Sequence, residues 1–158
     1  MSTEKNLEGI RGWLILVAIG VVVSLIRILA LIMTTYPEIL TSGIWEALTV
    51  EGNDAFHPLW APILTAEIIF NSALVLAWLY TAYLLFSRRR GFPNWYIGIA
   101  VFSLVLIICD AFAIKLVLPD EPVFDPETLK DVARSASMVL IWVPYMLVSK
   151  RARATFTK

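Results

Sequence analysis

The sequence is short of charged residues and of cysteine. Of its 158 residues, 59% are hydrophobic and only 16% are charged, against about 25% charged residues in an average soluble domain. Thirteen Lys and Arg balance thirteen Asp and Glu, which excludes the strongly basic footprint of a nucleic-acid-binding domain. A single cysteine, Cys109, excludes a disulfide framework or a cysteine metal cluster within one chain. The composition indicates one membrane domain over residues 1–158.

Catalytic motifs are also missing. The sequence contains no serine-nucleophile motif, glycine-rich phosphate loop or Cys-x-x-Cys pair, so we expect neither enzymatic activity nor a cofactor. Glu51, Asp54 and His57 follow one another in a predicted loop, and such side chains can bind metal ions. They lack a ligand spacing such as His-x-x-x-His, so we expect a solvated acidic loop and no metal site.

Four segments are predicted to cross a membrane as helices, at about residues 12–36, 59–87, 94–118 and 126–150. The first three are apolar over at least the ~20 residues that a crossing needs. The last apolar run is shorter, but Asp125-Pro126-Glu127 supplies an N-cap, a proline at the first helical position and an acid in the first turn. The sequence therefore predicts an all-α integral membrane protein with a four-transmembrane-helix bundle.

The distribution of charge predicts the orientation of this bundle. Basic residues gather in the N-terminal segment, in the turn 88–93 and in the C-terminal tail: Lys5, Arg11, Arg88, Arg89, Arg90, Lys150, Arg151, Arg153 and Lys158, opposed by Glu4 and Glu8. The loops 37–58 and 119–125 are acidic. By the positive-inside rule, both termini are cytoplasmic and these two loops are extracytoplasmic. Trp45 and Leu48 predict a short interfacial helix in the long first loop.

A layer of polar side chains is predicted in the outer half of the membrane. At 1.5 Å per residue, Arg27 and Asp110 lie roughly 20 Å from the cytoplasmic ends of their helices. Asn71 and Arg134 fall at the same level by the same rise, and Glu67 lies about one turn higher than Asn71. Lys115 falls off the face that carries Asp110, near the outer boundary, where it can act as an anchor that reaches the interface.

Two interpretations of this layer remain open. In the first, Arg27 and Arg134 pair with Glu67 and Asp110 in a neutral network that locks the helices together, as in a structural or accessory protein that packs against a membrane-protein partner. In the second, Arg27, Glu67, Asn71, Asp110 and Arg134 surround an outward-facing polar pocket, because intramembrane ionisable groups often mark sites. Arg27 would then attract a carboxylate or phosphate in a small transporter or ligand-binding protein, for which a homodimer would provide the room that one four-helix bundle lacks.

Several strings resemble one family. They are Gly9-Ile10-Arg11-Gly12-Trp13-Leu14, Trp45-Glu46-Ala47-Leu48-Thr49, His57-Pro58-Leu59-Trp60, Glu67 with Asn71, Ile141-Trp142-Val143-Pro144-Tyr145, Ser149-Lys150-Arg151 and Thr155-Phe156. Together they resemble the bacterial membrane family catalogued as domain of unknown function 2569. The resemblance implies a four-helix protein of the bacterial inner membrane with no agreed activity and no catalytic residues to carry over.

Overall fold

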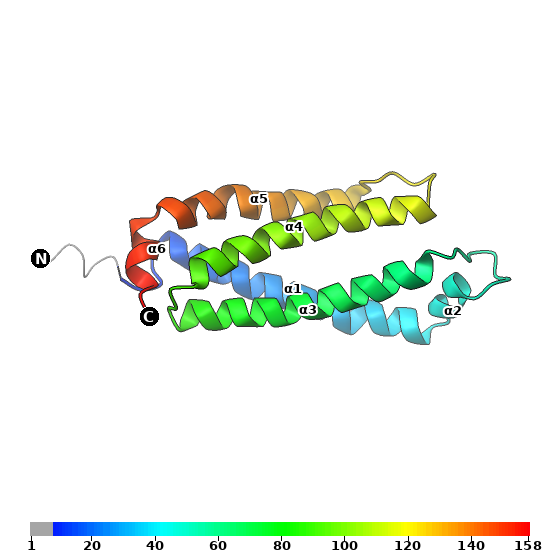
Figure 1. The fold of residues 1–158 in the computed structure, drawn as a ribbon, viewed down its shortest axis with the longest axis horizontal. Helices are drawn as coiled ribbons and strands as arrows, with labels where there is room; N and C mark the ends of the chain where they lie inside the picture. The colour runs from blue at the N-terminus through cyan, green and yellow to red at the C-terminus, as the bar shows by residue number, and fades with distance from the viewer. Residues whose placement is uncertain (1–7) are drawn as a thin grey trace, which may run out of the picture.

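The computed structural model describes residues 8–158, and that part of the chain is helical with no strand (Figure 1). The helices are α1 (Trp13–Thr41), α2 (Ile44–Thr49), α3 (Trp60–Phe86), α4 (Phe92–Val117), α5 (Pro126–Val148) and α6 (Lys150–Thr155). Glu4 and Lys5, which entered the prediction of orientation, lie outside the described residues.

Four of these helices, α1, α3, α4 and α5, are long and apolar enough to cross a membrane. The predicted all-α, four-transmembrane-helix bundle is therefore confirmed. Large apolar side chains such as Met33, Leu140 and Val148 are mostly exposed. Exposed apolar surface on this scale is unfavourable in water and marks contact with a membrane or a protein. The short helix α2 lies in the first long loop, where the sequence predicted it.

Helix α1 continues beyond its predicted end at residue 36, through Pro37, to Thr41. A proline lacks a backbone N–H, so only the carbonyl four residues earlier, that of Met33, loses its helical donor. The Thr41 hydroxyl donates to the Pro37 carbonyl at 2.6 Å. Gly43 then adopts a left-handed conformation with φ 83°, which glycine tolerates best, and the chain turns into α2.

The helix predicted at 126–150 ends two residues early, at Val148, and a separate short helix, α6, follows it. Helix α5 ends at Val148, and Ser149 is extended, with φ −70° and ψ 116°. The Ser149 hydroxyl accepts a hydrogen bond from the Ala152 backbone N–H at 3.2 Å, which makes it the N-cap of α6. From the sequence alone, the basic residues of α6 are predicted to lie in a C-terminal tail, because this helix is short and highly basic.

The four long helices form two pairs. Helix α1 packs mainly against α3, and α4 packs mainly against α5, while α3 joins the pairs through α4. Figure 1 shows the pairs close together at the end that holds the C-terminus and farther apart toward the other end. The hydrophobic core is concentrated at the first end, in Leu14, Val17, Val21, Leu74, Trp78, Leu84, Leu85, Phe92, Tyr96, Ile99, Met146, Ala152 and Phe156.

The C-terminal segment closes the same end of the bundle. The Thr155 hydroxyl is buried, accepts from the Gly9 backbone N–H at 3.1 Å and lies 3.2 Å from the Gly9 carbonyl, to which it donates. The Arg90 backbone N–H donates to the Lys158 carbonyl at 2.7 Å. The segment after α5 therefore ties the start of α1 to the turn between α3 and α4, and this end is sealed.

The N-cap of α5 is expected to make the stability of the protein depend on pH. The Asp125 carboxylate accepts from the Thr128 hydroxyl at 2.7 Å and from the backbone N–H groups of Thr128 and Glu127. These hydrogen bonds, the one from the Thr128 hydroxyl first, lower the pKa of Asp125 from its usual value. The pKa of Asp125 is therefore lower in the folded protein than in the unfolded chain, where it is about 3.9. The cap stabilises the folded protein fully above the unfolded-state pKa, and this stabilisation is lost as the pH falls through the folded-state pKa.

We expect Asp125→Asn to flatten this dependence, because asparagine also caps helices but does not titrate. Melting temperatures of the two purified proteins between about pH 5 and pH 2 provide the measurement. The difference between wild type and variant should shrink as pH falls. A difference that is constant over this range would contradict the assignment of the cap.

Candidate functional site

A cleft of about 590 Å³ opens between α3 and α4, in the half of the bundle away from the sealed end. Its walls are largely apolar and include Leu31, Ile63, Phe70, Leu106 and Leu116. Polar groups from three helices reach into the same space: Glu67, Asn71, Asp110, Glu127, Thr128 and Asp131. A smaller cavity of about 270 Å³ shares Asp110 and Thr128 with it. The cleft thus combines an apolar lining with a few polar groups, as ligand sites commonly do.

The position of Glu67 is set by a chain of hydrogen bonds between α3 and α1. The Asn71 side-chain amide donates to the Tyr36 hydroxyl at 2.6 Å, and this hydroxyl donates to Glu67 Oε1 at 3.3 Å. Tyr36 is buried, whereas Glu67 and Asn71 are half-buried and border the cleft. Glu67 and Asn71 are four residues apart and share one face of α3, which allows a single tyrosine to reach both.

The two arginines of the predicted layer bind one aspartate on α5. Arg27 of α1 donates from Nη2 to Asp131 Oδ1 at 2.9 Å, and Arg134 of α5 donates from Nη1 to the same oxygen at 2.7 Å. All three side chains are 45% exposed. Asp131 thus joins α1 to α5 and has two cationic partners, whereas residues 8–158 supply no ion pair to Glu67, Asp110 or Glu127.

The structure brings together three of the five residues that the sequence placed in the polar layer. Glu67, Asn71 and Asp110 line the cleft, whereas Arg27 and Arg134 are not among its lining residues. The network expected to pair these arginines with Glu67 and Asp110 is replaced by their ion pairs with Asp131. Helix α5 begins at Pro126, before the apolar run that follows Arg134. Its first turns bring Asp131 within reach of both arginines.

Sequence reasoning did not assign Tyr36 and Asp131 to the site. Tyr36 reads as one of several aromatic residues at a membrane interface, and nothing local shows that it reaches α3. Asp131 had a usable signal, because it precedes Arg134 by three residues, a spacing that allows an ion pair on one helix. Lys115 lies in the last turn of α4 and donates to the Pro119 and Glu121 carbonyls at 2.5 and 2.6 Å, so its side chain reaches the loop that follows the helix.

One family model matches the chain over residues 7–157, and its description is Protein of unknown function (DUF2569). The match covers nearly the whole chain, so the chain belongs to this family, as the sequence strings suggested. No curated protein and no solved structure matches it.

The sequence strings that resemble the family lie in two parts of the bundle, the sealed end and the cleft. Gly9 and Thr155 bond to each other, Ser149 caps α6, and Phe156 packs on Phe92 with ring centroids 4.4 Å apart. The strings at the two chain ends therefore account for the sealed end of the bundle, whereas Glu67 and Asn71 belong to the cleft.

Proposed function

We propose that this DUF2569 protein is a non-enzymatic ligand-binding protein of the bacterial inner membrane, and that the cleft between α3 and α4 is its binding site. One observation carries the proposal: a cavity of about 590 Å³ lies at the polar layer, within the range of roughly 300–1,000 Å³ that is usual for small-molecule sites. A purely structural role for the polar layer required a closed network of ion pairs that joined Arg27 and Arg134 to Glu67 and Asp110. The open cleft at this layer favours a ligand-binding role instead.

The proposed orientation places both termini in the cytoplasm and the mouth of the cleft toward the outside. Arg88, Arg89 and Arg90 follow α3 at the sealed end, together with the basic helix α6. The acidic loop between α4 and α5 lies at the opposite end, beside the cleft. By the positive-inside rule, the sealed, basic end faces the cytoplasm.

The lipid bilayer is the proposed partner of the exposed apolar helix faces. A structural or accessory role that uses a membrane-protein partner or a homodimer stays a prediction. The ligand-binding role is the one that the cleft supports directly, because a purely structural bundle gains nothing from an open cavity, which forfeits packing contacts.

The proposal is tested by thermal unfolding of the purified protein with four probes: phosphatidylethanolamine, tetraphenylphosphonium, tetraphenylborate and inorganic phosphate. At one hundred times its dissociation constant, a bound probe stabilises the folded state by about 2.7 kcal/mol, so a rise of several degrees is expected for at least one of them. Ala113→Trp and Ala66→Trp each fill the cleft from one wall and should abolish the rise.

Ala73→Trp is the matched control, because Ala73 is exposed on α3 and does not line the cleft. It should keep the stabilisation seen in the wild type. The proposed function is contradicted if no probe raises the melting temperature, or if the rise persists in both cleft-filling variants.

A further inference from the structure

All charged side chains that line the cleft have the same sign. Glu67 comes from α3, Asp110 from α4, and Glu127 and Asp131 from α5, and no lysine or arginine within residues 8–158 lines the same space. Asp131 is paired with Arg27 and Arg134, whose two positive charges exceed its single negative charge by one. The remaining three carboxylates make the cleft a site of negative charge, opposite to the anion site that Arg27 had suggested.

Glu67 and Asp110 face this space from opposite walls, at a depth where isolated charges are costly. Glu67 keeps one hydrogen bond from Tyr36, which satisfies only part of what a carboxylate accepts. Two carboxylates in one site of low dielectric repel each other when both are ionised, and a cation between them offsets this repulsion and part of their desolvation cost. The chemistry of the walls therefore selects for positive charge.

The rest of the lining selects for apolar surface. Phe70 and Leu116 line the cleft and are also exposed at its edge, with 45% and 66% of their surfaces free. On membrane-spanning helices such side chains border the lipid, so an apolar molecule can enter from the bilayer. At the sealed end, Trp78 packs edge-on against Tyr96 with ring centroids 6.5 Å apart, which closes the route toward the cytoplasm.

We propose that the cleft binds a hydrophobic organic cation, with Glu67 and Asp110 as its counter-charges. The inference rests on the proposed function, because it names the ligand class for the same cleft. A small inorganic cation would leave the apolar walls uncovered, and an anion would face the carboxylates. An aliphatic or aromatic ammonium or phosphonium ion matches both the charge and the lining.

The test compares tetraphenylphosphonium with tetraphenylborate, two ions of nearly the same shape and opposite charge. Equilibrium binding is measured on the full-length protein in nanodiscs of zwitterionic lipid, with empty nanodiscs subtracted. We expect the phosphonium to bind at least tenfold more tightly than the borate. Glu67→Gln and Asp110→Asn should each weaken phosphonium binding about tenfold, since each removes one counter-charge and keeps the side-chain shape.

Glu46→Gln is the matched control, because Glu46 is an exposed acid of α2 that does not line the cleft. Its phosphonium affinity should equal that of the wild type. If a cleft variant fails to fold, the preference of the wild type between the two ions still decides the inference.

Other outcomes separate the inference from the proposed function. If the borate binds as tightly as the phosphonium or more tightly, and this binding is lost in Ala113→Trp, the inference of a cationic ligand is wrong. The proposed function, a ligand-binding cleft, is then still supported. If phosphatidylethanolamine is the only probe that binds in the cleft, the inference of a hydrophobic cation is likewise wrong and the proposed function is still supported. If neither ion binds, the inference is wrong, and the remaining probes decide whether the cleft binds ligands at all.

Discussion

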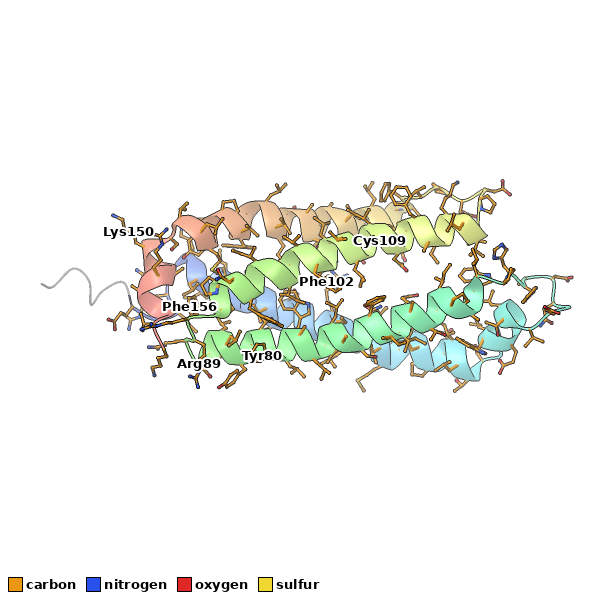
Figure 2. All side chains as sticks on the ribbon, in the orientation of Figure 1. Tyr80, Arg89, Phe102, Cys109, Lys150 and Phe156 are labelled. Atoms are coloured by element: carbon orange, nitrogen blue, oxygen red, sulfur yellow. The ribbon has the colours of Figure 1, made fainter. Side chains whose placement is uncertain are left out.

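Phe156→Ala is expected to lower the free energy of unfolding by about 3–5 kcal/mol, the usual cost of deleting a buried phenylalanine. Only 5% of the Phe156 surface is exposed, and its ring packs on Phe92. Figure 2 shows Phe156 at the sealed end. The residue follows α6 directly, so its loss also weakens the link between the C-terminal segment and the turn after α3. The expected effect is large because this end holds most of the core.

The measurement is equilibrium unfolding of the purified protein in mixed micelles. Phe102→Ala is the matched control, because Phe102 is 46% exposed on the middle of α4 (Figure 2) and leaves no enclosed cavity. It should cost much less than Phe156→Ala. Equal losses of stability in the two variants would contradict the description of the C-terminal segment as part of the core.

Tyr36→Phe is expected to lower the free energy of unfolding by about 1–3 kcal/mol, the cost of leaving buried polar partners unsatisfied. The ring stays and only the hydroxyl is removed. Asn71 then loses its acceptor and Glu67 loses its donor. Because Glu67 is no longer positioned, phosphonium binding should weaken in the same variant.

Tyr83→Phe is the control for this substitution. The Tyr83 hydroxyl accepts from Arg89 at 3.2 Å, and the pair is exposed, so its loss should change stability very little. Unfolding curves and phosphonium titrations of the two variants are compared under the same conditions. An unchanged stability of Tyr36→Phe would show that the bonds among Tyr36, Asn71 and Glu67 do not hold α1 to α3.

The number and approximate bounds of the long helices follow from the sequence because each depends on local properties. Apolar length predicts α1, α3 and α4, and the Asp125 cap predicts where α5 begins. The continuation of α1 through Pro37 and the break at Ser149 are each accompanied by a short-range side-chain hydrogen bond, which apolar length alone does not predict. Helix α6 owes its position to contacts with distant parts of the chain, such as that between Thr155 and Gly9.

The level of the candidate site and three of its residues could be predicted from the sequence, but its remaining members and its ion pairs could not. Rise per residue placed Glu67, Asn71 and Asp110 in one layer, and all three line the cleft. The partners of Arg27 depend on the rotation and tilt of α5, which rise per residue does not give. The separation of the two helix pairs depends on where the large core side chains lie, and this tertiary property determines that the layer is open.

The central claim is that the cleft is open to the outside and closed to the cytoplasm, and Cys109 tests it directly. Cys109, which Figure 2 labels on α4, is the only cysteine of the sequence. It is exposed and lines the cleft. Its labelling by a membrane-impermeant trimethylammonium methanethiosulfonate is measured in right-side-out and inside-out membrane vesicles. The variant that combines Cys109→Ala with Leu76→Cys, at an exposed apolar position of α3, is the lipid-facing control.

We predict rapid labelling of Cys109 in right-side-out vesicles, slower labelling in the Ala113→Trp variant, and little labelling in inside-out vesicles or of the control cysteine. Labelling of Cys109 only from the cytoplasmic side, or from neither side, would contradict the account.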